Sequence, residues 1–243
     1  MRKLSLPSDP RIWFKLWVVS LLLNSVPGVL FAQAQTEVTS ILAGIINATT
    51  PLMTLLVMLI IFRDEKISFN QIAGLITGAL GIATVFGIWN GVGTNPVWTI
   101  LMLLAAVLCY GISFPYSKRY VIPLQLPSEV LAATQLIMAT VTLVPFYLID
   151  GITEVQYRSI PLLSMLALGI FGSGFAYIWN FQVIKEAGSA IASTVTYITP
   201  LVAVMMGLLF LNEPLTWNEP VGGFIVLLGA AISQNRLVLF RRA

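Results

Sequence analysis

Long apolar runs alternate with short polar segments along the whole chain. A helix needs about 20 mostly apolar residues to cross the hydrocarbon core of a bilayer. Eight runs reach about that length, bounded by charges, polar clusters or Gly and Pro turns. The pattern predicts an all-α membrane protein with eight antiparallel transmembrane helices. The predicted spans cover residues 13–33, 38–62, 69–89, 97–117, 128–149, 160–184, 188–211 and 218–236.

Composition supports this prediction and excludes several other classes. Hydrophobic residues make up 58% of the chain, charged residues 9%, and the mean hydropathy is +0.91, whereas soluble domains are about a quarter charged. The net charge of +3 is dispersed over short connections, so we expect no nucleic-acid partner. With one cysteine, Cys109, no histidine and no ionisable residue deep in any span, we expect no enzyme, metal or cofactor.

The distribution of Lys and Arg predicts the orientation. If both termini lie on one side, every basic residue except Arg158 falls on that side, which indicates cytoplasmic termini in a multi-pass plasma-membrane protein. The first span also resembles a secretory signal peptide, with a basic start and a cleavage-like Ala32-Gln33-Ala34. Asn24 and Pro27 within the run argue against that alternative.

Two parts of the chain repeat each other. Ser40, Pro51, Glu65, Gly74 and Gly81 are echoed in order by Ser189, Pro200, Glu213, Gly222 and Gly229. The repeated motifs lie in the second and seventh predicted spans, which are five spans apart. Because consecutive spans cross the membrane in opposite directions, an odd separation means that the two copies are antiparallel. Inverted repeats are typical of secondary transporters, which place a substrate site between the repeats. We expect a three-helix partial repeat over residues 1–92 and a five-helix repeat over residues 93–243.

These motifs resemble the EamA-type branch of the drug/metabolite transporter superfamily. The segments that carry the resemblance are "SILAGIINATTPLMTLL" in the first copy and "SAIASTVTYITPLVAVMMGLLFLNEPLTW" in the second. The resemblance implies ten helices in two five-helix repeats, of which this chain lacks the first two. It also implies a carrier that moves a small metabolite, amino-acid-like or drug-like solute across the bilayer by alternating access. The alternative is a truncated, non-transporting fragment or membrane scaffold.

Polar and aromatic residues within the spans are the candidates for a substrate cavity. Polar side chains in hydrocarbon need a partner, so they should face the bundle interior, either toward a solute or in interhelical hydrogen bonds. Pro51 and Pro200 predict helix kinks beside the substrate path. Gly74-x-x-x-Gly78 predicts close packing within one chain or in a homodimer. The cavity candidates are Asn24, Asn47, Thr50, Tyr110, Phe114, Tyr177, Asn180, Thr196 and Tyr197.

Overall fold

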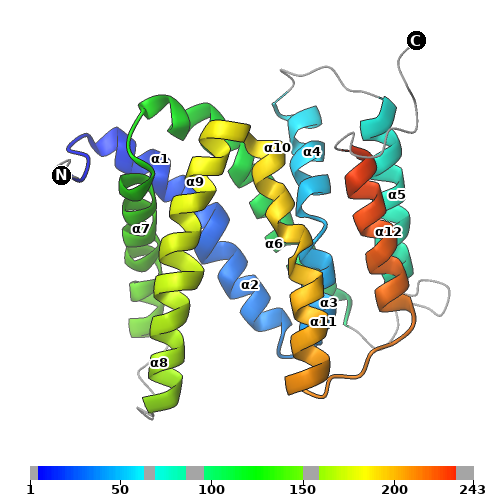
Figure 1. Ribbon diagram of the computed structural model, residues 1–243. Coiled ribbons are helices and arrows are strands. Elements are labelled where there is room, and N and C mark those ends of the chain that lie inside the picture. Colours follow the sequence, from blue (N-terminus) through cyan, green and yellow to red (C-terminus); the bar gives the residue numbers. More distant parts are fainter. Residues whose placement is uncertain (1–4, 63–68, 86–95, 150–158, 234–243) are drawn as a thin grey trace.

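The computed structural model describes residues 5–62, 69–85, 96–149 and 159–233, and within these ranges the chain is helical with no strand (Figure 1). The predicted all-α membrane class is therefore confirmed. Eight helical segments follow the order of the predicted spans, and we number them spans 1 to 8. Five of them are long and apolar enough, by length and composition, to cross a membrane. The other three are shorter or interrupted.

The first four spans contain these elements. Span 1 comprises α1 (Pro10–Ser20), the π-helical η1 (Leu21–Ser25) and α2 (Val26–Ala34); span 2 comprises α3 (Ser40–Asn47) and α4 (Thr50–Ile60); span 3 is α5 (Phe69–Val85); span 4 comprises α6 (Val97–Tyr116), the π-helical η2 (Ser117–Val121) and the 3-10 helix η3 (Ile122–Leu124).

The last four spans complete the bundle. Span 5 is α7 (Ser128–Ile149); span 6 comprises α8 (Ser159–Ala167), the π-helical η4 (Leu168–Phe175) and α9 (Ala176–Ala187); span 7 comprises α10 (Ser189–Ala192), the 3-10 helix η5 (Ser193–Tyr197) and α11 (Thr199–Phe210); span 8 is α12 (Asn218–Ser233).

Spans 2 and 7 are interrupted where their prolines occur. A proline has no N–H and clashes with the carbonyl four residues earlier, so a helix cannot run through it undisturbed. For Pro51 that earlier residue is Asn47, where α3 ends. The Asn47 carbonyl instead accepts a hydrogen bond of 2.7 Å from the Thr50 hydroxyl. Pro51 and Pro200 thus lie in the first turn of a helical segment, and the regular α-helix breaks just before each of them.

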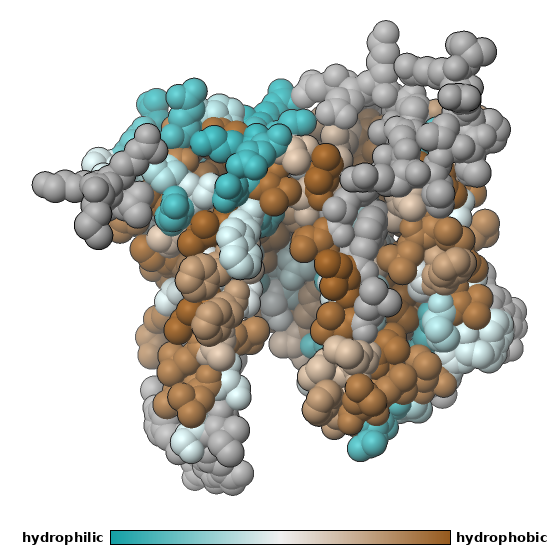
Figure 2. Space-filling model, in the orientation of Figure 1, coloured by the Kyte–Doolittle hydropathy of each residue, from teal (hydrophilic) through white to brown (hydrophobic). Residues whose placement is uncertain are grey.

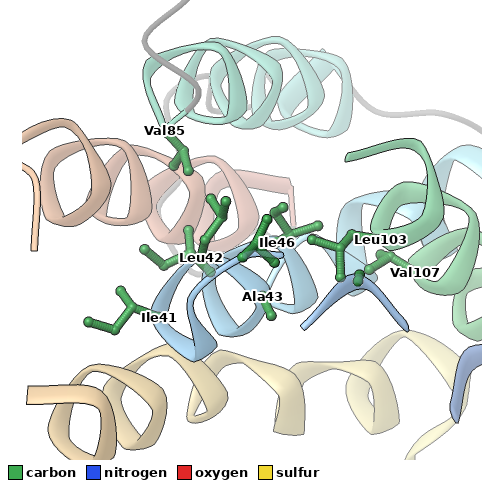
Figure 3. Close-up of a cluster of buried hydrophobic side chains, with 10 residues drawn as sticks. Ile41, Leu42, Ala43, Ile46, Val85, Leu103 and Val107 are labelled. Atoms are coloured by element: carbon green, nitrogen blue, oxygen red, sulfur yellow. The ribbon is translucent and has the colours of Figure 1, made fainter. Parts of the chain in front are cut away.

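The apolar core is centred on α3. Ile41, Leu42 and Ile46 are at most 3% exposed, and they pack with Val85 of α5 and Leu103 and Val107 of α6 (Figure 3). The N-terminus of α3 is held from the other end of the chain. Glu213 accepts hydrogen bonds from the backbone N–H groups of Ser40 at 2.8 Å and Ile41 at 3.1 Å. Such a carboxylate satisfies donors that no helical carbonyl can reach and complements the helix dipole.

The repeated glycines meet in one interface between α5 and α12. A Cβ on Gly74 would lie 2.5 Å from the carbonyl oxygen of Gly229, and one on Gly81 would lie 3.0 Å from that of Gly222. The two helices therefore pack antiparallel, backbone against backbone (Figure 1). Gly78 also lies in this interface, since its backbone N is among the atoms nearest to a Cβ on Gly229. These glycines make their close contacts within one chain.

Several charged residues lie at the two ends of the bundle, and eight of the 13 basic residues used to predict the orientation lie outside the described ranges. The start of α1, which carries Arg11 and Lys15, and the end of α9, which carries Lys185, lie at the upper end of the bundle in Figure 1. Glu213 and Glu219 lie at the opposite end, around the start of α12. Glu65 and Arg158 lie outside the described residues.

Candidate substrate cavity

A cavity with two connected lobes lies between spans 1, 2, 4, 6 and 7. The first lobe has a volume of about 800 Å³ and the second about 710 Å³. Asn47, Tyr110, Val195 and Ile198 line both lobes, so the lobes meet beside the interruptions of spans 2 and 7. Pockets for small molecules typically have volumes of about 300–1,000 Å³. Each lobe alone is large enough for a metabolite.

The first lobe is mostly apolar. α2 contributes Gly28 and Phe31, α3 contributes Ala43 and Gly44, and α11 closes the opposite side. The rings of Phe31 and Tyr110 stack with their centroids 6.0 Å apart and an interplanar angle of 21°. In the space-filling view the molecule is hollowed between the α8–α9 segment and α11, and apolar surface borders the hollow (Figure 2).

The second lobe combines aromatic rings with uncharged polar groups. Tyr110, Phe114, Tyr177 and Trp179 supply the rings, and Asn47, Asn180 and Thr196 supply the polar side chains. The lining residues described for the two lobes include no Asp, Glu, Lys or Arg. An ionic solute group would therefore have no side chain of opposite charge to pair with. Amides and hydroxyls can still orient a solute by hydrogen bonding.

Asn47 lies at the junction of the lobes and joins the two interruptions. Its amide nitrogen donates to the Thr199 hydroxyl at 3.4 Å, and its amide oxygen lies 3.4 Å from the Thr50 hydroxyl. Thr50 and Thr199 each precede the proline of their span. A side chain that bridges two interrupted helices responds to any relative movement between them.

Six of the predicted cavity residues line the cavity. They are Asn47, Tyr110, Phe114, Tyr177, Asn180 and Thr196. Asn24 instead accepts a hydrogen bond from the Gln135 amide of α7, and Thr50 is fully buried against its own backbone. Pro51 and Pro200 are also buried. The side chain of Tyr197 lies outside the described residues.

Most lining residues were not among the candidates, and Phe31, Trp179 and Thr199 are examples. Phe31 and Trp179 look like ordinary apolar residues of a span, and nothing in their spacing separates them from lipid-facing positions. Thr199 could have been found, because it corresponds in the repeat to Thr50, which was a candidate. A search that paired every candidate with its repeat equivalent would have included it.

The helices and the cavity define a polytopic α-helical membrane protein with a solute-sized internal site. Comparison with known proteins gives the family. The chain matches the EamA-like transporter family over residues 1–87 and 97–234, and it belongs to that family.

Relatives of this chain are named as transporters. The uncharacterized transporter YoaV of Bacillus subtilis (strain 168) is 25% identical over 181 residues, which are 74% of this chain and 61% of that protein. An uncharacterized transporter of Archaeoglobus fulgidus is 26% identical, over 80% of this chain and 68% of that protein. Protein PagO of Salmonella typhimurium is 27% identical, over 85% of this chain and 67% of that protein. The chain thus spans about two thirds of the length of these relatives.

A crystal structure of a protein with 20% sequence identity shares the fold. The match has a TM-score of 0.67 and covers 96% of this chain and 80% of that chain. At this identity the likeness concerns the helix arrangement alone. The family model and these names together show that the chain belongs to a family of membrane transporters.

Proposed function

We propose that this chain moves a small uncharged, zwitterionic or amphipathic solute of the amino-acid-like or drug-like class by alternating access. One observation carries the proposal: the cavity lies where the interruptions of spans 2 and 7 meet, and uncharged aromatic and amide side chains line it. Aromatic faces bind flat apolar groups, and amides discriminate by hydrogen bonding. The protein acts as a carrier without catalysis.

Two inverted repeats, over residues 1–92 and 93–243, supply the two access states. Pro51 and Pro200 are 149 residues apart in the chain. Adding 149 to the residue numbers of the π-helical segment 21–25 of span 1 gives 170–174, which lies inside the π-helical η4 of span 6. With a shift of 148 residues, the contact between Gly74 and Gly229 maps onto that between Gly222 and Gly81. Spans 1 to 3 and their equivalents, spans 6 to 8, can exchange conformations, and this exchange moves the opening from one membrane face to the other.

The cytoplasm borders the end of the bundle where α1 begins, and the plasma membrane is the location. Arg11, Lys15 and Lys185 lie at that end, and the bias of basic residues toward the cytoplasm supports this orientation. The cavity then opens, in alternation, to the cytoplasm and to the outside.

Flux measurements in proteoliposomes test the proposal. The purified chain is reconstituted, and counterflow is measured with a panel of labelled aromatic and aliphatic amino acids, nucleosides and flat drug-like dyes. Flux of at least one solute is expected, and Asn47→Ala should reduce it strongly because Asn47 lines both lobes. Thr140→Val is the matched control, since Thr140 is exposed and its hydroxyl bonds its own helix.

The alternative function is a non-transporting fragment or membrane scaffold. One observation favours it: no residue in an apolar 18-residue stretch of span 6 is buried within the described part of the molecule. A folded, monodisperse protein that moves no solute of the panel would support this alternative and refute transport by the chain alone.

A further inference from the structure

A polar cluster lies inside the bundle, outside the two lobes of the cavity. Gln135 of α7 is fully buried, and its amide nitrogen donates to the side-chain oxygen of Asn24 in η1. Ser25 follows Asn24 in η1 and is 3% exposed. The side-chain oxygen of Gln135 and the hydroxyl of Ser25 have no hydrogen-bond partner among the described residues.

Unpaired oxygens at this depth are costly. A buried polar atom without a partner costs about 1–3 kcal/mol, and the hydrocarbon around the bundle offers no water that could replace the partner. Asn24, Ser25 and Gln135 come from two helices that pack against each other. The unpaired hydroxyl of Ser113 lies on α6, which also packs against η1. Unpaired side-chain oxygens thus lie on span 1 and on two spans, 4 and 5, that pack against it.

The backbone of η1 departs from the α-helix at the same place. Val26 N–H donates to the Leu21 carbonyl, five residues back, as in a π-helix. Single π turns are rare, interrupt the regular ladder of hydrogen bonds and occur often at functional sites. Non-α backbone at membrane depth is tolerated where it is buried in protein. Asn24 and Ser25 therefore lie on a backbone segment that departs from the regular α-helix.

We propose that Asn24, Ser25 and Gln135 form a binding site for a sodium ion. Amide and hydroxyl oxygens are hard, neutral ligands that suit a monovalent cation. Calcium sites, in contrast, use carboxylates, and magnesium is usually bound by one or two carboxylates. None of the three residues Asn24, Ser25 and Gln135 carries a carboxylate. In secondary transporters, irregular helix segments commonly coordinate the coupling ion.

One contact connects the cation site to the cavity. Tyr177, which lines the second lobe, directs its hydroxyl to the carbonyl oxygen of Leu23 at 3.4 Å. Leu23 lies in η1, directly before Asn24, and it also lines the second lobe. A solute that contacts Tyr177 therefore acts on the backbone that carries the cation ligands. This coupling step rests on the proposed transport function, and the cation site itself does not.

Binding of ²²Na⁺ to the purified full-length chain tests the site without any solute. We expect saturable binding that unlabelled Na⁺ displaces and K⁺ or choline does not. Thermal unfolding should shift upward with NaCl and stay unchanged with equal KCl, because a ligand of the folded state stabilises it. Gln135→Met, which keeps the volume and removes the amide, should weaken Na⁺ binding by at least about tenfold.

The second π-helical segment provides the control. Ser173 in η4 corresponds to Asn24 in the repeat, and Gly174 corresponds to Ser25. Ser173→Ala should leave ²²Na⁺ binding unchanged. If Gln135→Met does not fold, Ser25→Ala, a smaller change, takes its place. Equal stability of the unmutated chain in Na⁺, K⁺ and choline would overturn the proposal, and so would wild-type Na⁺ binding by Ser25→Ala and Gln135→Met. Absence of solute flux would leave the binding result intact.

Discussion

Adding one methyl group to the glycine interface should destabilise the whole bundle. In Gly74→Ala the new Cβ lies 2.5 Å from the carbonyl oxygen of Gly229, whereas ordinary contacts begin at 3.4 Å, so the backbones must separate by about 0.9 Å. A gap of that size forfeits about a quarter to a half of each dispersion contact. Overpacking of this kind costs about 1–3 kcal/mol. At about 2–4 °C per kcal/mol for a chain of this size, the melting temperature should fall by about 2–12 °C.

Thermal unfolding in detergent, followed by size-exclusion chromatography, measures the effect. Gly222→Ala is the repeat equivalent and should behave alike, because its Cβ would lie 2.5 Å from the Val85 nitrogen. Gly28→Ala is the control, since nothing lies within 4 Å of its Cβ and alanine favours a helix more than glycine does. If Gly74→Ala and Gly222→Ala melt at the same temperature as Gly28→Ala, the reasoning is refuted.

Three further predictions concern the helix interruptions and the cavity. Glu213→Ala removes the cap of α3 and should cost about 0.5–2 kcal/mol in thermal unfolding, while Glu186→Ala, whose partner is a side chain one turn away, should be neutral. Thr50→Val removes the donor to the Asn47 carbonyl and should lower unfolding stability by about 1 kcal/mol; unchanged stability would contradict this role. Phe31→Ala removes a stacked ring and should weaken solute binding by about 0.5–1.5 kcal/mol in a ligand-induced thermal shift.

The spans and the glycine contacts could be predicted because each depends on a local rule. A bilayer imposes runs of about 20 apolar residues, so the helical segments follow directly from the hydropathy pattern. Gly74 and Gly222 were found through the repeat, and the structure brings both into one interface. Pro51 was predicted to disturb span 2, and the chain is interrupted there.

The partners of the polar side chains could not be predicted from sequence. Asn24 bonds to Gln135 across 111 positions, and Glu213 caps a helix more than 170 residues earlier. Such pairs depend on helix rotation and depth, which hydropathy does not specify. The π turns were also missed, because one inserted residue leaves the apolar pattern of a span almost unchanged.

Spans 1 and 6 differ in burial although they are equivalent in the repeat. Leu16 and Val19 of span 1 are 0% exposed, and α7 packs against α1. Their equivalents in span 6, Met165 and Leu168, are 72% and 66% exposed within the described chain. Leu168 also lines the first lobe. Span 1 is therefore packed against α7 and α6 along its length, whereas the packing of span 6 against α7 and α10 falls mainly on α9. If the chain transports as proposed, we therefore expect the α8–η4 part of span 6, which has no buried residue among those described, to be displaced at a smaller cost in contacts than span 1.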